Sequence, residues 1–268
     1  MPDTPARIPL RVAALQIEIA DGEPERNLDS ALTAADIALA SGAKLLLLPE
    51  LWTTGYMHDR WARIADDVTP AIAEELGRFC SSHDVHLGGS MIDRDSEGGL
   101  VNRFRLIGPS GETVASYDKA HLFAPMQEDQ YLAAGRVRTR FHVGGWTASP
   151  SICYDLRFPE MYRHEAVAGA ELFIVPSEWP LERAAIMRGL AWARAVENQA
   201  FLLLCNRTGT AADGTVFGGG SLIVAPDGAF LAEAGSAPDV LVATLDPANL
   251  DLRRRLPVLT GRVDGVDF

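Results

Sequence analysis

The sequence predicts an α/β layered protein that contains one mixed sheet or two sheets. Apolar runs of strand length alternate with segments in which apolar residues recur at helical spacing. Short runs joined by Gly-Pro turns add hairpins to this pattern, which argues against a purely parallel sheet. At 268 residues and 47% hydrophobic content, the chain can fill one large core, so a single domain over residues 1–268 is expected.

The first half of the chain begins with the strand 11–17. Pro24 suits the first turn of a helix, and apolar residues at helical spacing extend it to about Ser41-Gly42. The apolar run 45–48, bounded by Pro49, is typical of a strand that is buried on both faces. The elements expected next are a helix over Pro70 to His83 and strands near 85–92, 101–107 and 113–117, the last two joined by a turn at 108–111.

The second half returns to alternating helix and strand. The elements expected here are a helix over 158–169, a strand over 172–175, a helix over 181–199 and a strand over 201–205. The runs 221–225, 230–231 and 240–245, with the turn Pro226-Asp227-Gly228, predict a closing hairpin.

Charge and composition narrow the class of protein. A formal net charge of -12 argues against binding to nucleic acid or to anionic membranes. No apolar stretch is long enough for a membrane span, and residues 1–7 lack the apolar region of a signal peptide, so a cytoplasmic protein is expected. Cys80, Cys153 and Cys205 are expected to be reduced thiols. Gly218-Gly219-Gly220 lacks the pattern of a phosphate loop or a dinucleotide site, and no cofactor is expected.

Three reactive groups follow predicted strands. Glu50 comes after the apolar run 45–48, Lys119 after the strand near 113–117, and Cys153 where an apolar segment gives way to a polar turn. Taken singly, each has an ordinary alternative: a solvated loop acid, a surface lysine and a small core thiol. Together they form a chemical unit, because the carboxylate can take the thiol proton, the thiolate can attack a carbonyl or nitrile carbon, and the ammonium can stabilise the oxyanion.

The segments around these residues resemble the three signature blocks of the nitrilase superfamily, the carbon-nitrogen hydrolases. The blocks are Leu48-Pro49-Glu50-Leu51 with Thr54-Gly55-Tyr56, Tyr117-Asp118-Lys119 with His121-Leu122-Phe123, and Cys153-Tyr154-Asp155 with Arg157-Phe158-Pro159-Glu160. Their order and spacing also agree with the family. The segments 193–199 and 220–228 resemble structural parts of the same family.

The resemblance implies an αββα sandwich, with two mixed β-sheets between helix layers. It also implies a second glutamate near the lysine, which Glu128 matches, although the adjacent Asp129 leaves room for a one-residue error. Subunits are expected to pair as a homodimer or a higher homo-oligomer through the helices near Cys153. The apolar side chains of these helices fit an interface or ordinary core packing equally well; they are Phe158, Met161, Tyr162 and Trp192.

Within the family, the chain is most similar to the omega-amidase branch, which hydrolyses the side-chain amide of compounds such as 2-oxoglutaramate. Such a substrate carries a carboxylate, which requires a cation. Arg157 is the nearest candidate, with pairing to Glu160 as the alternative, and Trp179 fits either a wall of the acyl pocket or the core. The residues expected to contact the substrate are Tyr56, Tyr154, Arg157, Glu178 and Trp179.

Two departures from the branch leave the substrate open. Ile186-Met187 stands where relatives often carry aromatic or imidazole groups, and Leu256 to Phe268 follows the family ending only loosely. Either segment could line or cover the pocket. Deaminated glutathione, an aliphatic amide, a nitrile or an N-carbamoyl amino acid therefore stays as an alternative substrate.

Two other classes of function compete with an amidase. A non-catalytic binding protein on the same fold would be favoured by loss of Glu50, Lys119 or Cys153, and all three are present. A metal hydrolase would rely on the pair His83 and His86, whose spacing straddles a predicted helix end and strand start without a second cluster. No metal site is expected.

Overall fold

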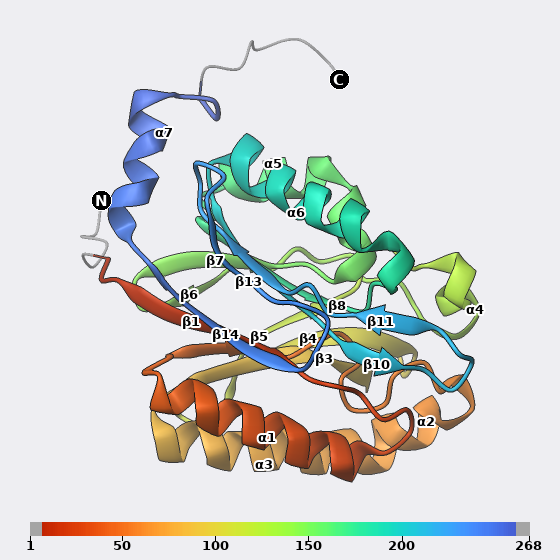
Figure 1. Cartoon of the computed structure of the whole chain (residues 1–268). Helices are drawn as coiled ribbons and strands as arrows, with labels where there is room; N and C mark the ends of the chain where they lie inside the picture. Colours follow the sequence, from red (N-terminus) through yellow and green to blue (C-terminus); the bar gives the residue numbers. More distant parts are fainter. Residues whose placement is uncertain (1–6, 261–268) are drawn as a thin grey trace.

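Two six-stranded sheets stacked face to face form the centre of the protein, and helices cover both outer faces (Figure 1). This arrangement is seen in a computed structural model that describes residues 7–260. Both sheets are mixed, because a parallel centre is flanked by antiparallel strands. The prediction of a sandwich with two mixed sheets between helix layers is confirmed.

The first sheet has the strand order β14-β1-β2-β3-β4-β5. Its strands are β1 (Leu10–Gln16), β2 (Leu45–Leu47), β3 (His86–Arg94), β4 (Leu100–Ile107), β5 (Thr113–Asp118) and β14 (Asp239–Leu245). Helices α1 (Pro24–Ala40) and α3 (Thr69–His83) lie side by side on its outer face (Figure 1). The short helix α2 (Trp61–Arg63) and a π-helical turn (Ile64–Val68) lead into α3.

The second sheet has the strand order β13-β12-β9-β8-β7-β6. Its strands are β6 (Phe141–Val143), β7 (Trp146–Pro150), β8 (Leu172–Ser177), β9 (Phe201–Asn206), β12 (Leu222–Val224) and β13 (Phe230–Glu233). Helices α5 (Pro159–Val167) and α6 (Ala184–Asn198) cover it (Figure 1). The remaining strands and α-helices are the hairpin β10 (Thr208–Thr210) and β11 (Val216–Gly218) and the short helices α4 (Glu128–Tyr131) and α7 (Leu252–Arg255).

The apolar run of β2 shows why a strand can be apolar on both faces. Leu45 and Leu47 belong to the core that includes the second sheet, whereas Leu46 and Leu48 belong to the core under α1 and α3. Successive side chains of a strand point to opposite faces, so a four-leucine run fills both layers. The prediction of a doubly buried strand is confirmed.

The closing hairpin is only partly as predicted. β12 and β13 pair antiparallel around the turn at 226–228, but β14 leaves this hairpin and pairs with β1 in the first sheet, from Leu10↔Leu245 to Gln16↔Asp239. A turn signal identifies neighbours in sequence and carries no information about a partner more than 200 residues away. The strand expected before Cys153 is β7, but its bounds and its antiparallel partner β6 were not predicted.

Other elements differ at their ends. The helix predicted over 181–199 is a 3₁₀ turn (Leu181–Arg183) followed by α6, and the helix predicted over 158–169 is the shorter α5. None of the helices within residues 7–260 is long and apolar enough to cross a membrane. Residues 1–6, on which the signal-peptide prediction mainly depends, lie outside the described residues. Residues 261–268, the last part of the divergent segment Leu256 to Phe268, also lie outside them.

Candidate active site

Chain segments that follow strands of both sheets bring Glu50, Lys119 and Cys153 together. Glu50 follows β2 and Lys119 follows β5 in the first sheet, while Cys153 follows β7 in the second. The ammonium Nζ of Lys119 lies 2.8 Å from Glu50 Oε1 and 2.7 Å from Glu128 Oε1. The side chains of these three charged residues are fully buried. The cluster therefore lies at one end of the sandwich, closed to solvent.

The Glu50 carboxylate is held by several donors. Asn102 Nδ2 donates to Glu50 Oε1 at 2.8 Å, and the backbone N–H of Glu178 donates to Oε2 at 3.1 Å. Asn102 was missed from the sequence. Strand β4 also contains Arg103 and Arg105, so the sequence offered no clear signal that Asn102 is the polar residue directed into the site.

Glu128 takes the position next to the lysine. Its carboxylate accepts hydrogen bonds from Tyr56 Oη at 2.7 Å and from the backbone N–H of Phe123 at 2.6 Å, in addition to Lys119. The neighbouring Asp129 is exposed. Of the two candidates, Glu128 is thus the one in the cluster.

Cys153 sits on a sharp turn. Its φ is 45°, a left-handed backbone conformation that is uncommon for a residue with a side chain, and it begins a 3₁₀ turn that runs to Arg157. The thiol is buried, with the residue 8% exposed. Strained backbone of this kind is common at functional sites because it presents one side chain at a fixed position.

Asp155 joins the cysteine turn to the lysine turn. One carboxylate oxygen accepts from the backbone N–H of Ile152 at 2.9 Å and from Tyr117 Oη at 2.8 Å. The other contacts the backbone N–H of His121 at 3.0 Å and its Nδ1 at 2.7 Å. Asp155 is fully buried. Its position in the cysteine block is visible in the sequence, but this role is not.

Burial controls the protonation of the cluster. Burial raises the pKa of Glu50, Lys119 opposes this rise, and Glu128 adds to it. For Lys119, burial acts against the charged form, but Glu128 and Glu50 raise its pKa well above the ordinary value. Burial and the adjacent Glu50 raise the pKa of the Cys153 thiol well above its ordinary value. The resting site therefore holds a charged lysine and a protonated thiol next to a carboxylate that can accept its proton.

A cavity opens onto Cys153. All five residues expected to contact the substrate line it, together with three that the sequence did not single out. The eight lining residues besides Cys153 are Tyr56, Phe123, Tyr154, Arg157, Glu178, Trp179, Pro180 and Arg183. Four of the lining residues are aromatic, and two arginines supply positive charge.

Arg157 does not pair with Glu160. Within residues 7–260, no carboxylate lies within ion-pair distance of its guanidinium, which instead lies 5.1 Å from the ring centre of Trp179 and 6.0 Å from that of Tyr154. Trp179 is 4% exposed and lines the cavity. Arg157 and Trp179 are thus placed to contact a molecule bound next to Cys153.

Glu178 is balanced by a buried arginine that the sequence did not assign. Arg207 is fully buried, with Nη1 3.4 Å from the Glu178 carboxylate and 3.1 Å from Asp21 Oδ1. Burial nevertheless raises the pKa of Glu178 well above its ordinary value; Arg207 opposes the rise, and Glu50 adds to it.

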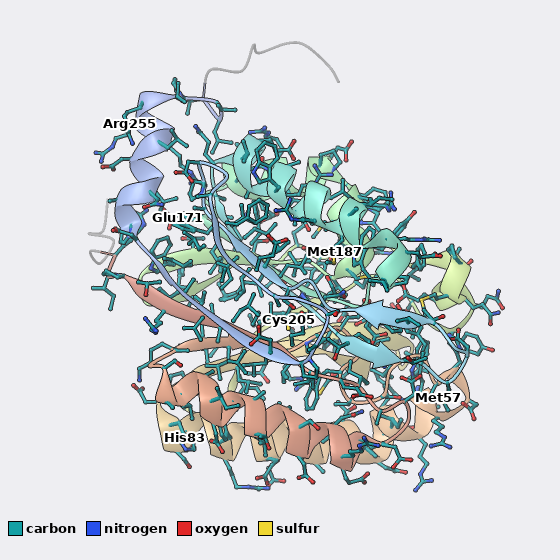
Figure 2. All side chains as sticks on the ribbon, viewed as in Figure 1. Met57, His83, Glu171, Met187, Cys205 and Arg255 are labelled. Carbon is teal, nitrogen blue, oxygen red and sulfur yellow. The ribbon has the colours of Figure 1, made fainter. Side chains whose placement is uncertain are left out.

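Other candidates lie away from this site. Met187 is buried in the core and Ile186 is exposed, and neither lines the cavity, so the expectation that this pair lines it is wrong. Cys80 and Cys205 are free thiols in the core, and Figure 2 shows Cys205 inside the sandwich and His83 on the outer helix layer. His83 ends α3 and His86 begins β3. Residues 7–260 contain no cluster of three or more His, Cys, Asp or Glu side chains suited to a metal ion.

Comparison with known proteins agrees with this geometry. The model of the family described as carbon-nitrogen hydrolase matches residues 11–255. A 2-oxoglutaramate amidase from Bacillus subtilis is 35% identical over 248 residues, which cover 92% of this chain and 95% of the relative. This similarity confirms the predicted relation to the omega-amidase branch.

Solved structures show the same fold. A CN-hydrolase superfamily protein from Xanthomonas campestris, with an arsenic adduct in its active site, superposes with a TM-score of 0.87 at 29% identity and covers 97% of this chain and 98% of its own. A mutant of an amidase from Nesterenkonia sp. AN1 has a TM-score of 0.82 at 32% identity, covering 93% of this chain and 95% of its own. That mutant carries the acetamide moiety of fluoroacetamide covalently at the active-site cysteine.

Proposed function

This chain belongs to the carbon-nitrogen hydrolase family, and we propose that it hydrolyses the terminal amide of a small carboxylate-bearing amide such as 2-oxoglutaramate. Ammonia is released, and a thioester on Cys153 is the intermediate. The observation that carries the proposal is the buried cluster in which Glu50 and Lys119 lie 2.8 Å apart, with Glu50 next to the thiol of Cys153, which lines the cavity.

In the first half-reaction, the thiol of Cys153 loses its proton to Glu50 while the sulfur attacks the amide carbon. The carbonyl oxygen becomes an oxyanion, which the Lys119 ammonium and the backbone N–H after Cys153 stabilise. Glu50 then returns the proton to the amide nitrogen, the C–N bond breaks, and ammonia leaves. The acyl group remains attached to sulfur as a thioester.

In the second half-reaction, Glu50 takes a proton from water, and the resulting hydroxide attacks the thioester carbon. Lys119 again stabilises the oxyanion. The C–S bond breaks, the sulfur regains a proton from Glu50, and the carboxylic acid leaves. Glu128 keeps its hydrogen bond to Lys119 throughout and holds the ammonium directed at the oxyanion, a positioning role that its contacts with Tyr56 and Phe123 support.

The substrate class is supported by the cavity and by the relative from B. subtilis that is named a 2-oxoglutaramate amidase. The acyl chain lies against the aromatic side chains Tyr56 and Tyr154. Its carboxylate meets Arg157, the partly buried guanidinium that has no ion-pair partner within residues 7–260. A cation at this position offsets the unfavourable net charge of -12 for an anionic substrate.

An ammonia-release screen tests the proposal. The purified protein is offered 2-oxoglutaramate, 2-oxosuccinamate, glutamine, simple amides, nitriles, deaminated glutathione and carbamoyl amino acids. Turnover of the two oxo-acid amides above the rest is expected, and Cys153→Ala should abolish it. Absence of turnover on both oxo-acid amides would remove this substrate class, and wild-type turnover by Cys153→Ala would remove the mechanism.

We also propose that the protein forms a homodimer through the outer face of α5 and α6. Tyr162 is buried in the core, but Trp192, Ile186 and Val167 remain 42%, 47% and 42% exposed on these helices. Exposed aromatic and aliphatic side chains on these two helices favour an interface. Sedimentation velocity of wild type and Trp192→Glu tests this: a dimer that persists in the variant would contradict it.

A further inference from the structure

The indole N–H of Trp179 is a buried donor without an acceptor. Trp179 is 4% exposed, and within the described chain its Nε1 has no hydrogen-bond partner. Other tryptophans use this group: Trp61 donates to the Gly55 carbonyl at 3.1 Å, and Trp146 donates to the Ile8 carbonyl at 2.9 Å. Because a buried tryptophan usually finds a partner for this group, the free N–H of Trp179 calls for an explanation.

The position of Trp179 is fixed by Asn206. The backbone N–H of Trp179 donates to Asn206 Oδ1 at 2.7 Å, and Asn206 Nδ2 donates to the Trp179 carbonyl at 3.1 Å. Asn206 Nδ2 also donates to the Gly219 carbonyl at 2.7 Å. The main chain of Trp179 is therefore held on both sides, and burial restricts its ring. A donor held in this way is organised before any ligand arrives.

A second group without a partner lies against the same ring. The guanidinium carbon of Arg157 is 5.1 Å from the Trp179 ring centre, and the Arg157 side chain forms no hydrogen bond or ion pair within residues 7–260. Both residues line the cavity that also contains Cys153. An unpaired cation and an unpaired neutral donor at adjacent positions fit an acceptor group with two oxygens and a negative charge.

We propose that the Trp179 indole N–H and the Arg157 guanidinium together bind the carboxylate of the substrate, each to one oxygen. Trp179 is then a specificity-determining residue as well as a wall of the cavity. The inference rests on the proposed hydrolysis of a carboxylate-bearing amide. It adds the residue that lets the enzyme distinguish such a substrate from a neutral amide of equal length, because only the carboxylate can use both donors.

The test compares wild type with Trp179→Phe, which keeps an aromatic wall and removes the N–H. Three amides of equal chain length are used: 2-oxoglutaramate, glutaramate, which lacks the ketone, and pentanamide, which also lacks the carboxylate. We expect kcat/KM to fall about 10-fold or more on the two carboxylates, the scale of a lost hydrogen bond to a charged group, and to change little on pentanamide. Arg157→Gln should show the same selective loss.

Affinity provides a second readout that does not need turnover. In the Cys153→Ala background, calorimetry measures the Kd of the same three amides with and without Trp179→Phe. A selective loss of affinity for the carboxylates is expected. The double variant Arg157→Gln with Trp179→Phe should lose less affinity than the sum of the losses in the two single variants, because both residues bind one group. This readout separates failure of the inference from failure of the proposed catalytic function.

Trp146→Phe is the matched control, since it removes a buried indole N–H whose acceptor is the Ile8 carbonyl, and it should leave the ratio of kcat/KM between the three amides unchanged. Three outcomes would overturn the proposal. Equal loss on all three amides by Trp179→Phe would assign a packing role. A loss confined to 2-oxoglutaramate would assign the N–H to the ketone, and no loss on any amide would leave it without a role in binding.

Discussion

The Lys119 ammonium and the Glu50 carboxylate come from turns 69 residues apart in the chain and lie 2.8 Å apart, with both side chains fully buried. Glu128 shares the same ammonium at 2.7 Å. Two carboxylates therefore depend on one cation in a buried site, and the protonation of each group is linked to the others.

Replacing Lys119 with Met should lower kcat by about 100-fold or more, because the oxyanion loses its charged partner. It should also reduce the free energy of unfolding by about 3 to 5 kcal/mol, the range for breaking a buried ion pair. Adding Glu128→Gln should recover part of the stability without recovering kcat. Steady-state kinetics and urea unfolding measure the two effects. The surface variant Lys44→Met, whose partner Asp84 is exposed, should change neither, and a wild-type kcat in Lys119→Met would contradict the assignment.

The activity should have an acidic limit set by Glu50. The base must be ionised, and burial raises the pKa of Glu50, so kcat/KM should fall as the pH drops through a midpoint above the ordinary value of 4.5. A pH profile of kcat/KM locates this midpoint. A midpoint at or below 4.5 would show that Glu50 is not the group that titrates.

Alkylation of Cys153 should depend on Glu50. Burial raises the pKa of this thiol, so little thiolate exists near neutral pH unless a base takes the proton. In Glu50→Gln the general base is lost, so iodoacetamide should react slowly at pH 7 and faster as the pH rises, as followed by mass spectrometry of the peptide that contains Cys153. Because the Glu50 charge raises the pKa of the thiol, the midpoint of this rise should lie below the thiol pKa of the wild type. Cys80, whose pKa burial raises to about 11, serves as the internal reference. Equal rates in wild type and Glu50→Gln would argue against proton transfer to Glu50.

Asp155→Asn should lower kcat more than it raises KM. The amide side chain cannot accept all the hydrogen bonds that the carboxylate receives from Ile152, Tyr117 and His121, so the cysteine and lysine turns lose their common anchor. Glu171→Gln is the control: it also alters a buried carboxylate, but at the opposite end of β8 from the cavity. If both variants lost stability alike and kept kcat, Asp155 would be only structural.

Arg207→Met should leave Glu178 and Asp21 without their shared cation. The expected loss is about 3 to 5 kcal/mol in the free energy of unfolding, because a charge is left buried and unpaired. Glu178→Gln in the same protein should restore part of it. Thermal and urea unfolding of the wild type, the two single variants and the double variant complete a double-mutant cycle. An additive result would show that the two residues are not coupled.

Much of the site could be predicted from the sequence because its main groups follow local patterns. An apolar run bounded by Pro49 marks the strand before Glu50, and the cysteine and lysine blocks occur as contiguous signatures. Such patterns determine which residues end strands, since the side-chain periodicity of a strand is visible in a few residues. The α/β class, the nucleophile candidate and the acid and base candidates could all be identified in this way, whereas the two-sheet sandwich was implied by the resemblance to the nitrilase superfamily.

The tertiary structure decided which groups share a partner. That Arg157 lies against Trp179 and not against Glu160, that Glu128 and not Asp129 holds Lys119, and that Arg207 balances Glu178 all depend on distances between remote segments. The same is true of β14, which joins β1 across the molecule. Ion pairing and burial act through space, so the sequence alone determined the reactive groups, and only the packed fold determined their charges and neighbours.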